Sequence, residues 1–153
     1  MQTKLFINMS PWDDKGSRVI EPRLDGVDRH FDMRNNCRIE SIKILDGNLV
    51  FLFNGRSYNP LNIEKLSAPR KFSLIFRRVT DIAVSPEDFL PHSGISEMMD
   101  DFVFIADDNN KGAQVIWFGD SNSDAEDARI AFHTDGVEFV EEQYEWPDIR
   151  PNE

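Results

Sequence analysis

The densest group of side chains that could do chemistry is the carboxylate cluster in GDSNSDAED, residues 119–127. Calcium binding is one possible use, because an EF-hand loop takes oxygen ligands from positions 1, 3 and 5, a glycine at position 6 and a bidentate glutamate at position 12. Counted from Asp120, positions 3 and 5 are Asn122 and Asp124, but positions 6 and 12 are both alanine. The sharp turn and the bidentate ligand are missing, so we predict no metal site and no cofactor.

Three histidines are the other candidates for chemistry, since an imidazole can act as a general acid or base near neutral pH. His30 precedes Asp32 by two residues, His133 precedes Asp135 by the same spacing, and His92 stands in LPHSG. Such pairs are common, and a base also needs an orienting group and a reactant within hydrogen-bond reach. The sequence contains no nucleophile elbow, no glycine-rich phosphate loop and no His-x-x-x-His pair. We therefore predict no catalytic residues and a protein that is not an enzyme.

Charge is distributed very unevenly along the chain. Residues 1–86 contain 14 Lys and Arg and 10 Asp and Glu, a net charge of +4, whereas residues 87–153 contain 3 and 18, a net charge of −15. The acidic part repels phosphates, which argues against nucleic acid as a ligand. It would instead attract a basic protein surface and speed its association. The alternative is that the acids only keep a small protein in solution.

Two polar loops carry the acids that we predict to bind this partner: DDNNKG, residues 107–112, and GDSNSDAED. The predicted partner-binding residues are Asp107, Asp108, Asp120, Asp124, Glu126 and Asp127. The two loops lie at opposite ends of the strand expected at 114–119, so they need not form one surface. The sequence does not indicate the oligomeric state.

The elements that must position these residues are mostly strands, because apolar residues alternate with polar ones. The clearest case is 37–53, where Asp46-Gly47 predicts a tight hairpin turn with positive φ at both residues. Residues 128–142 predict a second hairpin, with its turn at Thr134-Asp135-Gly136. Residues 101–119 predict a third, closed by the polar loop DDNNKG.

Extended character continues through 71–85, and a short strand is expected at 4–8. Helical signals are weak and restricted to short pieces that begin at Ser85 and at Ser96. These observations predict a mainly β fold, an antiparallel sandwich or strongly bent sheet of about eight strands with one or two short helices.

The length of the chain predicts one domain over residues 1–153. Residues 1–35 hold prolines, glycines and charges and are expected to be largely irregular, and 143–153 is expected to be a loose tail. No apolar run approaches the roughly 20 residues that cross a bilayer, and MQTKLFINMSPWDDK lacks the apolar core of a signal peptide. We predict a cytoplasmic protein with no membrane partner.

The stretch HFDMRNNCRIESIKILDGNLVFLF, residues 30–53, followed by FSLIFRRVTDIAVS, has a recognisable order: a polar lead-in, a strand, an Asp-Gly turn and an alternating return strand. It resembles small β-rich bacterial immunity proteins of polymorphic or contact-dependent toxin systems. The resemblance covers about a third of the chain. It implies a protein that binds and neutralises a toxin domain, often a nuclease with a basic active-site surface. It provides no motif from which individual binding residues could be assigned.

Two other functions remain open on the sequence. The first is a small-ligand-binding β-barrel, or an enzyme built on one, in which a histidine would project into a polar cavity of several hundred Å³, roughly the usual range. The second is an interaction domain without any toxin partner, which the neighbouring genes would distinguish.

Overall fold

The structure is a computed structural model of the 153-residue chain. It describes residues 5–11, 19–24, 27–28, 30–32, 36–59, 62–85, 102–108, 111–118 and 129–141. Over these ranges the secondary structure consists of strands, which confirms the mainly β class. The short helices expected from Ser85 and Ser96 fall almost entirely outside the described residues, as does the tail 143–153.

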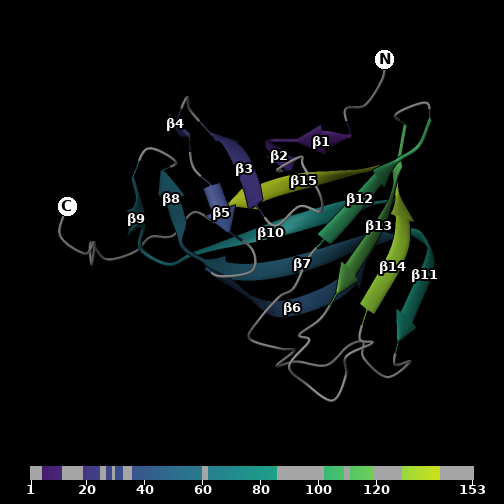
Figure 1. Ribbon diagram of the computed structural model, residues 1–153. Coiled ribbons are helices and arrows are strands. Elements are labelled where there is room, and N and C mark those ends of the chain that lie inside the picture. Colours follow the sequence, from purple (N-terminus) through teal and green to yellow (C-terminus); the bar gives the residue numbers. More distant parts are fainter. Residues whose placement is uncertain are drawn as a thin grey trace.

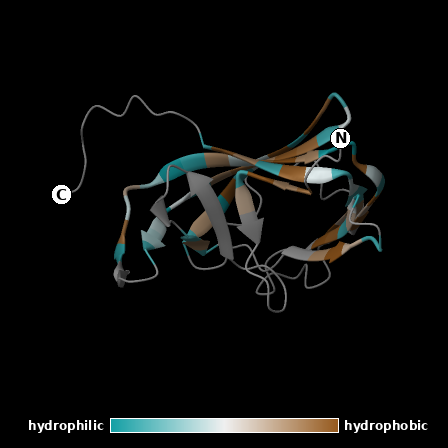
Figure 2. Cartoon of the chain, turned by 90° about the horizontal axis from the view of Figure 1, so that it is seen from above, coloured by the Kyte–Doolittle hydropathy of each residue, from teal (hydrophilic) through white to brown (hydrophobic). Residues whose placement is uncertain are grey.

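A five-stranded sheet forms the middle of the molecule, with the strand order β1-β15-β10-β7-β6 from top to bottom in Figure 1. Its strands are β1 (Phe6–Ile7), β15 (Gly136–Glu141), β10 (Arg70–Arg77), β7 (Asn48–Gly55) and β6 (Cys37–Leu45). All neighbours are antiparallel except β1 and β15, which are parallel. Buried and half-buried residues alternate along β7 and β10, so one face of each strand packs on the core. Hydrophobic residues, brown in Figure 2, run along the strands in the middle of the molecule.

The predicted hairpin of residues 37–53 is confirmed as β6 and β7. Its turn has positive φ at both Asp46 (52°) and Gly47 (79°), as a type I′ turn requires. The inward alternation is also confirmed, because Leu49, Phe51 and Phe53 are completely buried. For this hairpin the sequence pattern correctly predicted both the turn and the face that packs on the core.

A second, four-stranded sheet has the order β12-β13-β14-β11 from left to right in Figure 1. Its strands are β12 (Phe102–Ala106), β13 (Ala113–Phe118), β14 (Arg129–Thr134) and β11 (Thr80–Ser85), all antiparallel. The pairing of β12 with β13 confirms the predicted hairpin of residues 101–119.

The two sheets share a corner, because the chain passes from β10 to β11 and from β14 to β15 at the same place. The N–H of Asp135 donates to the carbonyl of Arg77 at 2.9 Å, and the Thr134 hydroxyl donates to the same carbonyl at 2.6 Å. The turn of the β6–β7 hairpin supports the corner, since the Val79 N–H donates to the Gly47 carbonyl at 2.9 Å. The strongly bent sheet expected from the sequence is thus formed by two chain segments that continue through the bend.

The hairpin predicted for residues 128–142 is wrong. β14 and β15 do not pair with each other but belong to different sheets. The physical reason is that neither Asp135 nor Gly136 adopts the positive φ that a tight reversal needs. Each strand instead finds its partner on the β10–β11 segment, and Asp135 lies at a bend.

A third group of short strands corrects the expectation that residues 1–35 are irregular. The path β2-β3-β5-β8-β9 forms one sheet, and β4 pairs with β3. Its members are β2 (Met9–Pro11), β3 (Val19–Leu24), β4 (Val27–Asp28), β5 (His30–Asp32), β8 (Ser57–Asn59) and β9 (Asn62–Leu66).

The strands outnumber the eight expected for two reasons: the corner divides the long segments, and this third sheet adds short strands.

Phenylalanine side chains join the three sheets into one core. Phe31 on β5 lies 4.5 Å from Phe72 on β10, measured between ring centroids, and Phe76 on β10 lies 4.9 Å from Phe132 on β14. All four rings are completely buried. Truncating one such ring to alanine typically costs about 3–5 kcal/mol, so β10 is the structural centre of the fold.

Candidate functional site

Asp107 is the first predicted partner-binding residue that the structure describes. It follows β12 directly, and its N–H donates to the Gly112 carbonyl at 2.9 Å, which closes the loop between β12 and β13. Its carboxylate Oδ2 lies 2.7 Å from Nε2 of His133 on β14. Because a carboxylate can only accept, the imidazole N–H is the donor. Asp107 therefore has an intramolecular partner and is not a freely available acid.

Gly112 makes the approach of this loop to β14 possible. A Cβ atom at this position would lie 2.7 Å from Cε1 of His133, 2.8 Å from the Thr134 carbonyl and 2.9 Å from Oδ2 of Asp107. Any larger residue would push the loop away from β14 and lengthen the Asp107–His133 hydrogen bond. The glycine that ends DDNNKG is thus explained by packing against a neighbouring strand.

The remaining predicted residues divide into two groups. Asp108 is exposed at the same end of the sheet as Asp107. Four others, Asp120, Asp124, Glu126 and Asp127, lie outside the described residues. Strand register nevertheless locates the two points between which residues 119–128 run, because Phe118 at the end of β13 pairs with Arg129 at the start of β14. These points lie at the end of the sheet opposite to Asp107, so the predicted acids belong to two ends of one sheet.

A second acidic segment connects at that opposite end. Residues 86–101 run from the end of β11 to the start of β12, and Ser85 pairs with Arg129 while Phe102 pairs with Trp117. Segments 86–101 and 119–128 contain five and four Asp and Glu, respectively, and no Lys or Arg. The topology therefore attaches nine acids to one end of the four-stranded sheet through four neighbouring strand ends. The sequence alone did not reveal that these two segments join strand ends on the same side of one sheet.

The histidines occupy different environments. His30 on β5 is buried, and its ring centroid lies 5.5 Å from that of Tyr58. His92 lies outside the described residues. His133 is partly exposed and is oriented by Asp107, which is 26 residues away in sequence, instead of by the nearby Asp135. Asp135 is directed to Arg78, with 3.8 Å between carboxylate and guanidinium. No local pattern in the sequence could have identified the Asp107–His133 pair.

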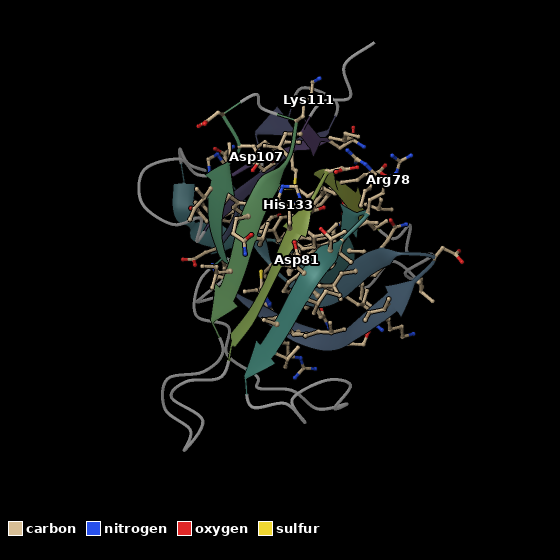
Figure 3. All side chains as sticks on the ribbon, turned by 90° about the vertical axis from the view of Figure 1, so that its right-hand side faces the viewer. Arg78, Asp81, Asp107, Lys111 and His133 are labelled. Atoms are coloured by element: carbon tan, nitrogen blue, oxygen red, sulfur yellow. The ribbon has the colours of Figure 1, made fainter. Side chains whose placement is uncertain are left out.

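His133 lies on the outer face of the four-stranded sheet. Figure 3 looks onto this side, with Lys111 and Asp107 above His133, Asp81 below it and Arg78 at the edge. Asp81 lies in a bulge of β11, because Thr80 pairs with His133 and Ala83 with Ala131. Its φ of 55° is in the left-handed region, which Asp tolerates better than most residues.

The single cysteine does not contribute a reactive group. Cys37 is a buried free thiol on β6. Burial, with a smaller contribution from the negative charge of Asp32, raises the pKa of the Cys37 thiol far above its ordinary value. Because the thiolate is the nucleophile and the metal ligand, Cys37 stays protonated and inert near neutral pH.

Within the ranges that the structure describes, no group of three or more His, Cys, Asp or Glu side chains is arranged to hold a metal ion. A search of the same residues for a helix of membrane-spanning length and hydrophobicity finds none. In comparisons with known proteins, no family model, no characterised protein and no solved structure matches the chain.

Proposed function

We propose that the protein is a non-enzymatic binding protein of the cytoplasm, an immunity protein that neutralises a basic toxin domain, such as a nuclease, through an acidic surface. One observation carries the proposal: two connections with nine acids and no Lys or Arg attach to the same end of one sheet. The strand ends that these two connections join are thereby within a few strand spacings of about 4.8 Å each.

Such a concentration of carboxylates selects its partner by charge. It repels phosphates and anionic surfaces and attracts surfaces rich in Lys and Arg. Electrostatic steering of this kind raises association rates by about 10–10³-fold and weakens as salt is added. A nuclease active site is a suitable target, because it must carry positive charge to hold its own phosphate substrate. The acids would then occupy the place of those phosphates.

Three basic residues of the first half pair with acids that lie outside the two connections. Lys71 pairs with Glu40 at 3.3 Å and Arg70 pairs with Glu141 at 3.2 Å, both on the five-stranded sheet. Arg78 pairs with Asp135 at the corner, at 3.8 Å. These basic side chains are engaged away from the two connections, which supports the proposal of an acidic end.

The alternative of a ligand-binding barrel or an enzyme built on one has less support. It needs convergent polar groups around an internal cavity. The inward positions of the sheets are instead occupied by large apolar side chains such as Phe51, Phe76 and Phe132. The partly exposed His133 lies on the outer face of its sheet, not among these rings.

The experiment is to co-express the chain with the product of each directly adjoining gene and to measure binding at low and high salt. We expect a stoichiometric complex with one basic product, an association rate that falls steeply with salt, and protection of cells from that product's toxicity. Neutralising the C-terminal cluster (Asp120→Asn, Asp124→Asn, Glu126→Gln, Asp127→Asn) should slow association. If no adjoining product binds, or if binding does not depend on salt, the immunity function should be abandoned.

A further inference from the structure

We propose that the outer face of the four-stranded sheet is the surface on which the basic protein partner docks. The inference rests on the proposed function for the basic character of the partner. It adds the place of contact, a flat apolar centre with exposed acids beside it, which the acidic loops alone do not provide.

Strand register identifies the outward residues. Ile105 on β12, Gln114 on β13, His133 on β14 and Thr80 on β11 stand side by side in one row across the sheet. Their inward neighbours on the two central strands, Ala113, Val115, Phe132 and Thr134, are buried in the core. The row therefore points away from the core along all four strands.

The next outward row is apolar and small. It contains Ile116 on β13, Ala131 on β14 and Ala83 on β11, which are paired in register. Ile105 in the first row is 55% exposed and Ile82 in the bulge of β11 is 38% exposed. Two alanines between larger apolar residues give a flat centre over which another protein surface can approach closely.

The dimensions of the sheet fit the core of an interface but not a whole one. Four strands spaced about 4.8 Å apart, each of about five residues rising about 3.3 Å, present roughly 14 by 17 Å. A standard interface buries about 800 Å² on each partner, so the sheet face supplies about a third of it. The rest must come from the surrounding rim, where the charges lie.

Charge at the rim selects the partner. Asp81 and Asp108 are exposed carboxylates, and neither lies in an ion pair within the described part of the chain. They lie near the His133 end, while the nine acids of the two connections attach at the other end. Lys111 and Arg78 are exposed basic residues at the same end, and Arg78 is paired with Asp135. An apolar centre with Asp81 and Asp108 at one end, and with the attachment points of the two acidic connections at the other, fits a basic surface that has an apolar side chain at its middle.

The outer face of the five-stranded sheet is the comparable alternative, and its charge argues against it. It also presents apolar residues, with Val140 38% exposed and Val50, Leu52 and Ile75 half-buried. However, the exposed charged residues on its β6 edge are Arg38 and Lys43. This face is therefore less favourable for a basic partner, so the two faces provide a target and its control within one molecule.

The first test is an amide NMR titration with the cationic peptide Lys-Leu-Lys-Leu-Lys, with Glu-Leu-Glu-Leu-Glu as the charge-reversed probe. We expect saturable shifts at Ile105, Gln114, Ile116, Ala131 and His133 with the cationic peptide only. Shifts that map to the five-stranded sheet, or equal binding of the acidic peptide, would overturn the proposal. This arm needs no toxin, so it tests the surface independently of the immunity function.

The second test compares Ile105→Lys with Leu45→Lys, because both residues are equally exposed, at 55% and 54%, on different sheets. On the docking face, the new lysine of Ile105→Lys should weaken binding of the cationic peptide, and of any adjoining gene product that binds, at least about tenfold. Leu45→Lys should change affinity less than about twofold. Equal effects of the two variants would refute the surface even if the immunity function holds.

The third test removes one rim charge without disturbing the backbone. Asp81→Asn and Asp46→Asn both replace an exposed Asp at positive φ, 55° and 52° respectively, with a residue that tolerates the same conformation. Asp81→Asn should reduce the salt dependence of association, and Asp46→Asn should not. Identical salt dependence in the two variants would contradict the proposed rim. Circular dichroism of every variant must match the parent chain, so that a loss of binding is not a loss of fold.

Discussion

Of the three Asp-Gly dipeptides in this protein, those at 46–47 and 135–136 lie among the described residues, and these two sites have opposite roles. At 46–47 both residues have positive φ and the chain reverses into an antiparallel hairpin. At 135–136 neither residue has a positive φ, and the chain bends from one sheet into the next. A Cβ on Gly47 would meet nothing within 4 Å, whereas one on Gly136 would lie 2.9 Å from the Leu5 carbonyl. Glycine is needed at the first site because the backbone has positive φ, and at the second because a side chain would clash with its neighbours.

The largest expected effect tests the space at the corner. Gly136→Ala forces a methyl group against the Leu5 carbonyl and the Arg77 side chain, so β1 or β10 must shift. We expect the free energy of unfolding to fall by about 2–3 kcal/mol, as for overpacked buried sites. Urea denaturation measures this change. A loss below about 0.5 kcal/mol would mean that the corner is not tightly packed.

The next effect tests what holds the bend in place of a turn. Thr134→Val removes the hydroxyl that donates to the Arg77 carbonyl at 2.6 Å and accepts from the Gly136 N–H at 3.3 Å. Loss of a buried hydrogen-bonding group of this kind costs roughly 1–2 kcal/mol. Thr80→Val, at an exposed position of β11, is the control and should stay within about 0.5 kcal/mol of the parent. Equal losses at the two threonines would contradict the role of the hydroxyl.

Gly47→Ala tests the conformation at the hairpin. An alanine at φ of 79° is strained although it has ample room, so we expect a loss of about 1 kcal/mol. Gly47→Asn should recover part of that loss, because asparagine tolerates positive φ. At the corner the order should reverse, and Gly136→Asn should be worse than Gly136→Ala because it needs more room. Thermal unfolding of the four variants decides between the two roles, and the same order at both sites would refute the distinction.

The smallest effect concerns the aspartates of the two dipeptides. Asp135 lies 3.8 Å from Arg78, whose side chain is 85% exposed, so the pair is well screened by solvent. Asp135→Asn and Asp46→Asn should each change the free energy of unfolding by less than about 0.5 kcal/mol. A larger loss for Asp135→Asn would show that the ion pair stabilises the corner. Otherwise the hydrogen bonds to the Arg77 carbonyl account for its stability.

The sequence was informative where structure depends on near neighbours. Alternation correctly assigned Phe51, Phe53 and Leu74 to the core face, because side chains on a strand point to opposite sides in turn. It also correctly placed the 46–47 turn. It failed at 134–136, because whether Asp-Gly reverses the chain depended on pairing with β10 and β11, about 57 residues away at Thr134 and Arg77. Local composition likewise hid the short strands β2 to β5, which are defined by their mutual pairing.

The candidate site shows the same division. The acids at 107–108 and 119–127 were visible in the sequence, and their separation to opposite ends of β13 follows from the register. The engagement of Asp107 by His133 was not visible, because the two residues lie on strands that meet only in the folded sheet. The outer face with Ile105, Ile116 and Ala131 was also missed, since period-two alternation does not distinguish an apolar outward residue from a core one. Strand order was needed to recognise it.

The pairing of β1 with β15 has a consequence for the order in which the chain folds. Phe6 on β1 lies opposite Val137 on β15. β15 also pairs with β10 and covers the edge of β10 that faces away from β7. Because β15 is synthesised last among the described strands, most of the chain has left the ribosome before β10 and β1 can pair with β15. Until then the inner face of β10, with Phe72 and Phe76, lacks one neighbour. Contacts of such long sequence separation are typical of proteins that fold in milliseconds to seconds, and we expect that nascent chains ending before residue 136 fail to close this core.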